Sequence, residues 1–221
     1  MTSLRYRAVL FDLDGTLVDS YAALAGAVNY ARREHGLNDL SDARIRTFVG
    51  EGLEKLLQRA FSADDVPPTV QAAFEQRYDE ICCVESKVLA DVEQTLDTLS
   101  HLGVTMAVCT NKPTYFSRKI LDFLGLGRHF RAIVGPDLAG ARKPDAQHVA
   151  RTIEEAGCGD ARVLFVGDMP IDVRAARNSG IEVAVVASGS STAEELRAAA
   201  PDHFLERFSD VVGIVRNGDS A

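Results

Sequence analysis

The sequence predicts an α/β protein built on a doubly wound parallel sheet, with an all-helical segment inserted after the first strand. Short apolar runs alternate with amphipathic stretches along most of the 221 residues, and each apolar run ends in polar residues or glycine. One long segment shows helical periodicity alone. Alternating strands and helices are typical of a parallel sheet with helices on both faces.

The short apolar runs are the expected strands. They are mostly apolar up to their carboxyl ends, which is typical of strands that are buried on both faces. The expected strands cover residues 9–13, 105–110, 132–135, 163–167 and 183–187.

The segments between these runs repeat their apolar residues every three or four positions, which predicts helices. The expected helices cover residues 92–102, 114–124, 145–156, 171–179 and 192–199. Ligands of such proteins bind beyond the carboxyl ends of the strands. Polar residues that follow the strands are therefore the candidate site.

Residues 21–84 show helical signals only, with a Pro-containing loop at residues 64–69. Residues 86–91 are expected to return the chain to the core. A chain of this length can hold one core domain and a smaller insert. We therefore expect a core domain of residues 1–19 and 86–221 and a helical domain of residues 20–85. Asp19 and Ser20 are expected to cap the first helix of that insert.

Composition excludes several classes of function. The formal net charge of -8 argues against binding to nucleic acid or to an anionic membrane surface. No apolar run approaches the roughly 20 residues that a membrane helix needs, and residues 1–7 are too polar for a signal peptide. A cytoplasmic protein without a nucleic-acid or membrane partner is expected. The four cysteines lack metal-ligand spacing and are interpreted as buried or incidental thiols.

Polar side chains end the core strands and are expected to meet at one edge of the sheet. Neighbouring carboxylates are costly to remove from water unless a cation accompanies them. Oxygen ligands with few soft ligands nearby favour Mg²⁺, which takes one or two carboxylates together with substrate phosphate. A hydroxyl and a lysine would then bind the remaining phosphate oxygens. The residues concerned are Asp12, Asp14, Thr110, Asn111, Lys143, Asp168 and Asp172.

Four segments that contain these residues resemble, in order, the motifs of haloacid dehalogenase superfamily phosphatases. They are residues 12–20 (Asp-Leu-Asp-Gly-Thr-Leu-Val-Asp-Ser), 109–113 (Cys-Thr-Asn-Lys-Pro), 142–145 (Arg-Lys-Pro-Asp) and 166–172 (Val-Gly-Asp-Met-Pro-Ile-Asp). The chain is most similar to the phosphoglycolate phosphatase-like group with a helical cap. The resemblance covers nearly the whole chain and implies a Rossmann-like core, with residues 20–85 as the cap.

The resemblance also implies roles for individual residues. Asp12 would attack phosphorus to form an aspartyl-phosphate, and Asp14 would move the proton. Mg²⁺ would bind a carboxylate oxygen of Asp12, the backbone carbonyl of Asp14 and Asp168. Asp172 would order a metal-bound water or Lys143. Thr110 and Lys143 complete the catalytic set.

Each of these assignments has a structural alternative. Asp172 at the start of a helix can be a helix cap. Thr110 can cap the helix that follows Pro113, and Lys143 can be a solvated loop lysine.

Phosphate or substrate contacts are expected at Leu13 and Asn111 and at two glycines of the insert. Gly50 and Gly52 precede an amphipathic helix and would present backbone N–H groups to a small anion. The alternative is a turn between helices that needs glycine for a positive φ.

The expected substrate is a small phosphorylated metabolite, with phosphoglycolate as the first choice. A phosphosugar phosphatase, a pyrophosphatase and a β-phosphoglucomutase-like mutase are alternatives, although the mutase motif usually has Val at the position of Thr16. Asp14 argues against a dehalogenase, because halide needs no proton on leaving. A phosphonate-cleaving relative would need a Schiff-base lysine from the cap, and Lys55 and Lys87 fit that role poorly.

A non-enzymatic phosphoacceptor module is the alternative from a different class. Receiver domains also gather acids, Thr and Lys around Mg²⁺, but they lack a helical insert after the first strand. A monomer or a homodimer is expected.

Overall fold

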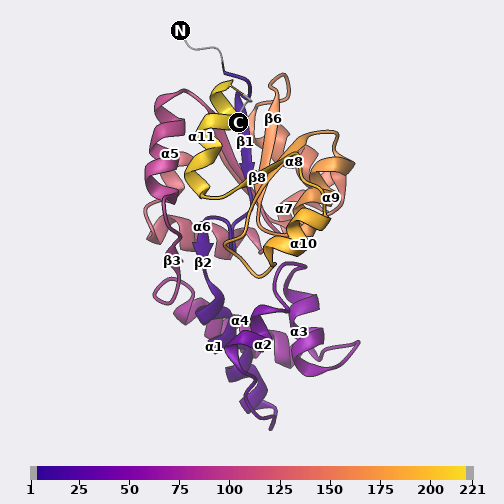
Figure 1. The fold of residues 1–221 in the computed structure, drawn as a ribbon. Coiled ribbons are helices and arrows are strands. Elements are labelled where there is room, and N and C mark those ends of the chain that lie inside the picture. The colour runs from indigo at the N-terminus through magenta and orange to yellow at the C-terminus, as the bar shows by residue number, and fades with distance from the viewer. Residues whose placement is uncertain (1–3, 218–221) are drawn as a thin grey trace.

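The structure is a computed structural model that describes residues 4–217. Within this range, one parallel sheet has the strand order β5-β4-β1-β6-β7-β8 (Figure 1). Every neighbouring pair in that sheet runs parallel. The strands are β1 (Ala8–Phe11), β4 (Thr105–Cys109), β5 (Ala132–Val134), β6 (Val163–Gly167), β7 (Glu182–Val186) and β8 (His203–Leu205).

The sheet buries side chains on both faces. Along β1, Val9 and Phe11 belong to one hydrophobic cluster, whereas Ala8 and Leu10 belong to a second cluster. This alternation follows from the two-residue period of a strand. All four residues are completely buried, as expected for a strand inside a doubly wound sheet.

Helices cover the two faces of the sheet. On one face lie α5 (Val92–His101), α6 (Thr114–Phe123) and α11 (Val211–Asn217), whose apolar side chains join the cluster of Val9 and Phe11. On the other face lie α8 (Ala146–Ala156), α9 (Pro170–Asn178) and α10 (Ala193–Ala198). Figure 1 shows the two groups of helices on opposite sides of the strands. The predicted α/β class with a doubly wound sheet is confirmed.

The expected core helices are correct to within one residue at each end. Capping side chains explain two of the starts. The carboxylate of Asp145 accepts a hydrogen bond from the backbone N–H of Gln147, and the hydroxyl of Thr192 accepts one from Glu195.

Four helices form a separate group, called the helical unit below: α1 (Tyr21–Glu34), α2 (Asp42–Arg46), α3 (Leu53–Phe61) and α4 (Pro68–Ile81). It lies at the end of the core where the parallel strands finish (Figure 1). The structure corrects the expected loop at residues 64–69, because α4 already begins at Pro68. Proline suits the first turn of a helix, since its missing N–H has no partner there.

Two short strands join the helical unit to the core. β2 (Val18–Asp19) pairs with β3 (Lys87–Val88) in antiparallel fashion, so the segment expected to be only a linker contains a strand. The cap expected at Ser20 is wrong in part. The carboxylate of Asp19 accepts from the N–H of Tyr21, but the hydroxyl of Ser20 makes no capping bond.

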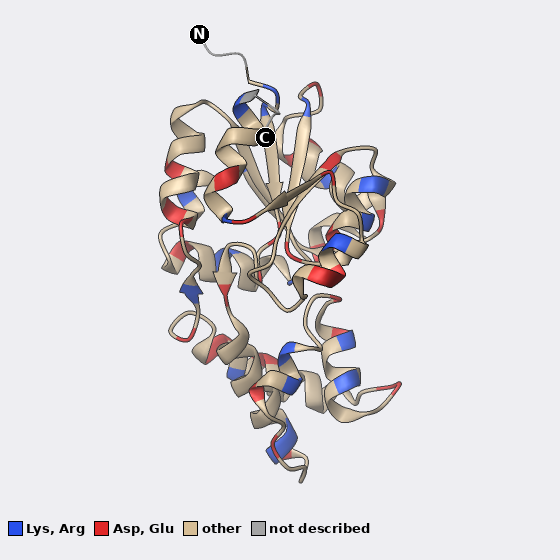
Figure 2. Ribbon diagram, in the orientation of Figure 1, with Lys and Arg blue, Asp and Glu red and all other residues tan. Residues whose placement is uncertain are grey.

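Several further properties concern the described residues as a whole. None of their helices is both long and apolar enough to cross a membrane. Figure 2 shows basic and acidic residues mixed over the core and the helical unit. The four cysteines are unpaired, and all except Cys83 are buried. Residues 1–3 and 218–221 of the expected core domain lie outside the described residues.

Candidate active site

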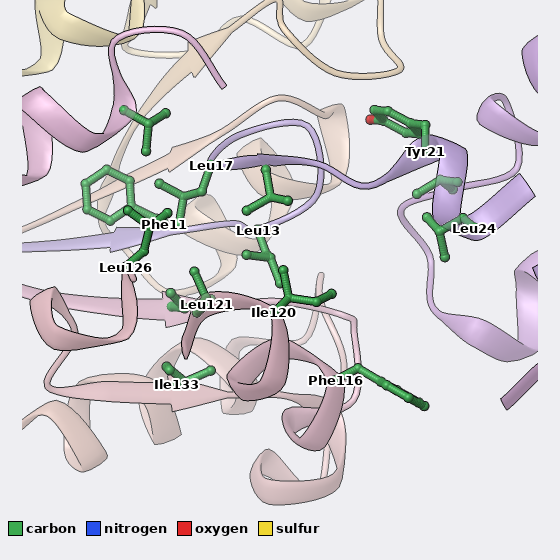
Figure 3. Packing of buried hydrophobic residues seen from close by; sticks show 14 of the residues in the cluster. Phe11, Leu13, Leu17, Tyr21, Leu24, Phe116, Ile120, Leu121, Leu126 and Ile133 are labelled. Carbon is green, nitrogen blue, oxygen red and sulfur yellow. The ribbon is translucent and has the colours of Figure 1, made fainter. Parts of the chain in front are cut away.

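The loop that follows β1 carries the first two candidate carboxylates. The backbone N–H of Asp12 still donates to the carbonyl of Val166 at 2.9 Å, and the chain then turns through Leu13. The completely buried side chains of Leu13 and Leu17 anchor the loop in the hydrophobic cluster that also contains Ile120 of α6 (Figure 3). The polar groups of this loop are therefore held on a rigid apolar base.

Gly15 lets this loop approach its neighbours closely. Its φ of +84° is in the left-handed region, and an added Cβ would lie 2.5 Å from Oδ2 of Asp168 and 2.6 Å from the hydroxyl of Tyr21. A side chain at this position would push the loop away from Asp168. Glycine is therefore required at position 15 so that the loop of Asp12 and Asp14 can lie against Asp168.

Lys143 connects Asp12 with Asp172. Its Nζ lies 2.9 Å from Oδ1 of Asp12 and 2.8 Å from Oδ1 of Asp172, and it is almost completely buried. Burial alone would lower the pKa of Lys143, but the two carboxylates keep it raised. The alternative of a solvated loop lysine is thereby excluded.

Asp172 uses both of its oxygens within the protein. Oδ1 accepts from Lys143, and Oδ2 accepts from the backbone N–H groups of Asp168 and Met169. It is thus a helix cap and a partner of Lys143 at once, so the alternative of a helix cap describes only part of its contacts.

The two carboxylate oxygens of Asp168 have different surroundings. Its Oδ1 accepts from the hydroxyl of Thr16 at 2.7 Å, whereas Oδ2 is buried and has no hydrogen-bond partner among the described residues. Burial and the charges of Asp12 and Asp172 raise the pKa of Asp168 well above its usual range. An orphaned carboxylate oxygen of this kind is costly unless a cation binds it.

The donor set fits a hard divalent cation. Ligand oxygens of Asp12, Asp168 and Asp172 lie within 4.8 Å of one another. When ionised, the three carboxylates carry three negative charges and Lys143 carries one positive charge, which leaves a net charge of two negative units. A group of oxygen ligands with this charge suits Mg²⁺.

Thr110 and Asn111 follow β4, as predicted. Thr110 is buried, and its hydroxyl accepts from the N–H of Lys112 at 3.3 Å. The N-cap position of α6 is Pro113, so Thr110 does not cap that helix. The side-chain amide of Asn111 binds backbone groups of two other segments. Its Nδ2 donates to the carbonyls of Gly50 and Lys143, and its Oδ1 accepts from the N–H of Lys143.

Asp14 faces a lysine that the sequence did not single out for catalysis. Its Oδ1 lies 2.5 Å from Nζ of Lys112 and accepts at 2.5 Å from the hydroxyl of Ser20. The side chain of Lys112 is 4% exposed and that of Asp14 is 14% exposed. Two donors therefore hold one oxygen of Asp14.

A cavity lies between the core and the helical unit. Its polar lining includes Asp12, Asp14, Thr110 and Lys112, whereas the helical unit contributes a mostly apolar wall. Its volume is about 50 Å³, and a single water needs roughly 10–15 Å³. The space suits a molecule of a few heavy atoms.

Gly50 and Gly52 also line this cavity, and both have a positive φ. A Cβ on Gly50 would lie 2.1 Å from Sδ of Met169 in the core. Gly50 therefore lets the helical unit sit directly against the residue that follows Asp168. Gly50 and Gly52 therefore form a turn that needs glycine for its positive φ, and the same turn lines the cavity.

Residues 9–186 match the model of the family described as haloacid dehalogenase-like hydrolase. The chain belongs to this family. The match includes every candidate site residue, and it extends over the helical unit and over the core from β1 to β7.

Relatives of this hydrolase are phosphatases by name. A phosphoglycolate phosphatase of Pectobacterium atrosepticum is 32% identical over 97% of this chain and 94% of its own. An N-acetylmuramic acid 6-phosphate phosphatase of Pseudomonas aeruginosa is 32% identical over 86% and 85%. The crystal structure of a predicted phosphoglycolate phosphatase from Haemophilus somnus has a TM-score of 0.87 at 29% identity, over 95% and 97% of the two chains. The family and these relatives support a phosphatase.

Sequence reasoning did not identify several side chains of this hydrolase that contact the candidate site. Lys112 and Thr16 lie inside the quoted motifs, so their position next to predicted site residues was an available signal. Tyr78 comes from the helical unit, where helical periodicity shows an apolar or polar face but not a long-range partner. Asp12, Thr110 and Asp168 were predicted together because each follows a core strand and the ends of parallel strands converge.

Proposed function

We propose that the protein is a Mg²⁺-dependent phosphomonoester hydrolase that forms an aspartyl-phosphate on Asp12. Its substrate would be a small phosphorylated metabolite, for which phosphoglycolate is the first choice. One observation supports this most strongly. Asp12, with its Oδ1 paired to Lys143, and Asp14, held by Ser20 and Lys112, line the same small cavity.

Asp12, Asp168 and the backbone carbonyl of Asp14 would hold Mg²⁺, with Asp172 fixing Lys143 beside them. When bound, the ion would neutralise charge on the transferring phosphoryl group. The free Oδ2 of Asp168 supports this assignment, because the oxygens of Asp172 are already occupied.

Asp12 would act as the nucleophile. Its Oδ1 accepts from the N–H of Leu13 at 2.7 Å and lies 2.9 Å from Nζ of Lys143, so its orientation is fixed by two donors. The other oxygen would attack phosphorus while the bond from phosphorus to the leaving oxygen breaks. A carboxylate needs no base to activate it, and the acyl phosphate that it forms is reactive enough to be hydrolysed. The hydroxyl of Thr110 would donate to a phosphoryl oxygen.

Asp14 would carry the proton between the two half-reactions. In its protonated form it would donate to the leaving alkoxide, and its carboxylate would then take a proton from water. That water would attack phosphorus and release phosphate and the Asp12 carboxylate. The hydrogen bond from Ser20 would hold Asp14 at the cavity through both steps.

The helical unit would act as the cap, within a domain of residues 20–85 on a core of residues 1–19 and 86–221. Closure over the cavity would exclude water from the aspartyl-phosphate. Asn111 would contribute by holding both Gly50 of the cap and the backbone of Lys143. Gly50 and Gly52 would complete the wall around the leaving group.

Phosphoglycolate is favoured by the relatives that carry this name and by the small cavity. The large alternatives, such as a sugar phosphate, would need the cap to open further. A cytoplasmic location is part of this proposal.

Hydrolysis of p-nitrophenyl phosphate by wild type and by Asp12→Asn, with and without Mg²⁺, tests the proposal. We expect Mg²⁺-dependent release of nitrophenol by wild type alone. Equal inactivity of the two proteins with Mg²⁺ present would refute the phosphatase assignment. Comparison of kcat/KM across phosphorylated metabolites would then rank the substrates.

A further inference from the structure

Lys112 is a buried cation in the lining of the cavity, and Lys143 is not among the residues that line it. Nζ of Lys112 pairs with Asp14, and burial, which alone would lower its pKa, is outweighed by the negative charge of Asp14, so the pKa is raised. Lys112 is thus held as an ammonium group beside Asp14, the residue that would donate a proton to the leaving oxygen. An ammonium group has three N–H donors, and Oδ1 of Asp14 accepts one of them.

Tyr78 lies next to this ammonium group. Nζ of Lys112 is 5.2 Å from the centre of the Tyr78 ring. Tyr78 is 1% exposed and lines the cavity, and its hydroxyl, which contacts Lys112, has no acceptor for its own O–H among the described residues. Buried hydroxyls usually have a partner, so this one is an unused donor at the cavity.

The remaining wall of the cavity does not offer a second positive charge. Among the described residues that line it, Lys112 is the only cationic side chain. The helical unit adds apolar side chains around it, namely Leu24, Val49, Leu53, Leu56 and Phe74. A small anionic group would find its one cationic partner at Lys112 and apolar side chains on the wall that the helical unit contributes.

We propose that Lys112 and Tyr78 form a subsite for a carboxylate on the leaving group. One N–H of Lys112 would stay with Asp14, while another N–H and the hydroxyl of Tyr78 would bind the substrate carboxylate. The subsite rests on the proposed phosphatase function and deepens it, because it makes phosphorylated small hydroxy acids the preferred substrate class. It also places the leaving oxygen beside Asp14, since both carboxylates share one ammonium group.

Two substrates that differ only in this charge test the proposal. Phosphoglycolate and ethyl phosphate both release a two-carbon alcohol, but only phosphoglycolate carries a carboxylate. For wild type we expect kcat/KM to be roughly 100-fold or more higher for phosphoglycolate, because a buried charge pair is strong. The measured quantity is the ratio of the two kcat/KM values in each variant.

Three substitutions in the subsite and one outside it complete the design. Lys112→Met is expected to reduce the ratio by roughly 100-fold, and Lys112→Arg is expected to restore most of it. Tyr78→Phe removes one neutral donor and is expected to reduce the ratio by roughly tenfold. Lys119→Met is the matched control, because Lys119 pairs with Asp79 on the surface and does not line the cavity; its ratio should equal that of wild type.

The outcomes separate this proposal from the proposed function. If Lys112→Met lowers kcat/KM equally for both substrates, or if wild type does not prefer phosphoglycolate to ethyl phosphate, the subsite is refuted while the phosphatase stands. If wild type hydrolyses neither these esters nor p-nitrophenyl phosphate, the proposed function itself fails. If Lys112→Met does not fold, Lys112→Arg and Tyr78→Phe decide, and a ratio unchanged in Tyr78→Phe overturns the two-residue subsite.

Discussion

The ammonium group of Lys143 lies 2.8 Å from Oδ1 of Asp172, and both side chains are completely excluded from solvent. Asp172 in turn receives the N–H groups of Asp168 and Met169, so this pair joins the loop of Lys143 to the end of β6. Removal of Lys143 would leave the buried carboxylate of Asp172 without a cation, and removal of Asp172 would leave Lys143 with Asp12 as its remaining carboxylate partner.

Asp172→Asn tests this relationship. We expect kcat to fall roughly 10- to 100-fold, because Lys143 loses the group that orients it beside Asp12. The free energy of unfolding should fall by about 3 kcal/mol, since a buried ion pair is broken. Steady-state kinetics and urea unfolding measure the two effects. Wild-type kcat in Asp172→Asn would show that Lys143 is positioned without Asp172.

Gly50→Ala should weaken catalysis by moving the helical unit. The new Cβ would lie 2.1 Å from Sδ of Met169 on a backbone with a φ of +119°, so the end of the Met169 side chain or the loop of Gly50 must shift, and we expect kcat/KM to fall roughly tenfold. Gly36→Ala is the control, because Gly36 also has a positive φ but an added Cβ would meet nothing within 4 Å. It should cost about 1–2 kcal/mol of stability and leave kcat/KM unchanged. Equal kinetic effects of the two substitutions would contradict the proposed contact.

Arg46 joins the helical unit to a loop of the core. Its Nη2 donates to the carbonyl of Gly189 at 2.6 Å, and Ser188 of the same loop donates to the carbonyl of Gly15 at 2.6 Å. We expect Arg46→Met to lower kcat/KM roughly tenfold, because a charge-assisted hydrogen bond between the two parts is lost. Arg44→Met on the same helix should have little effect, since Arg44 lies over Phe48 within the helical unit. If the two variants have the same kinetics, Arg46 does not hold the two parts together.

His148 should make stability depend on pH. It is completely buried, with Nε2 donating to the carbonyl of Val134 at 3.1 Å, and burial lowers its pKa from 6.5 to about 4. Below pH 6.5 the unfolded chain therefore binds a proton that the folded protein excludes, and stability falls until the folded form is also protonated near pH 4. The loss from His148 should be about 2 kcal/mol between pH 7 and pH 5.

Urea unfolding of wild type and His148→Gln at pH 7 and pH 5 measures this contribution. Wild type should lose more stability than the variant by the stated amount, whereas His101→Gln, at an exposed position, should behave as wild type. Identical pH dependence in His148→Gln and wild type would contradict a neutral buried His148.

The sequence predicts the core of this fold because buried strands and amphipathic helices leave strong periodic patterns. β6 is correct at both ends, since all five of its residues are buried and glycine ends it. β8 was missed because its three residues lie at the edge of the sheet, and His203 interrupts the apolar pattern. β2 and β3 were missed because two-residue strands are too short for periodicity to register.

The sequence likewise predicts some residues of the candidate site and not the contacts between others. Asp12, Thr110 and Asp168 were predicted together because parallel strands bring their carboxyl ends to one edge. Contacts such as Lys112 with Asp14 join positions that are 98 residues apart. Both residues belong to the core and follow the neighbouring strands β1 and β4, but which side chains pair there depends on the conformation of the two loops, which no local pattern in the chain encodes.

Asp12 is expected to become phosphorylated during turnover, and this intermediate can be trapped. Acid quenching of wild type with Mg²⁺ and phosphoglycolate, followed by borohydride reduction, converts an aspartyl-phosphate into homoserine, which peptide mass spectrometry locates. We predict homoserine at position 12, and none without substrate or in Asp12→Asn. Homoserine at the position of another aspartate, or continued turnover by Asp12→Asn, would contradict the assignment of Asp12 as the nucleophile.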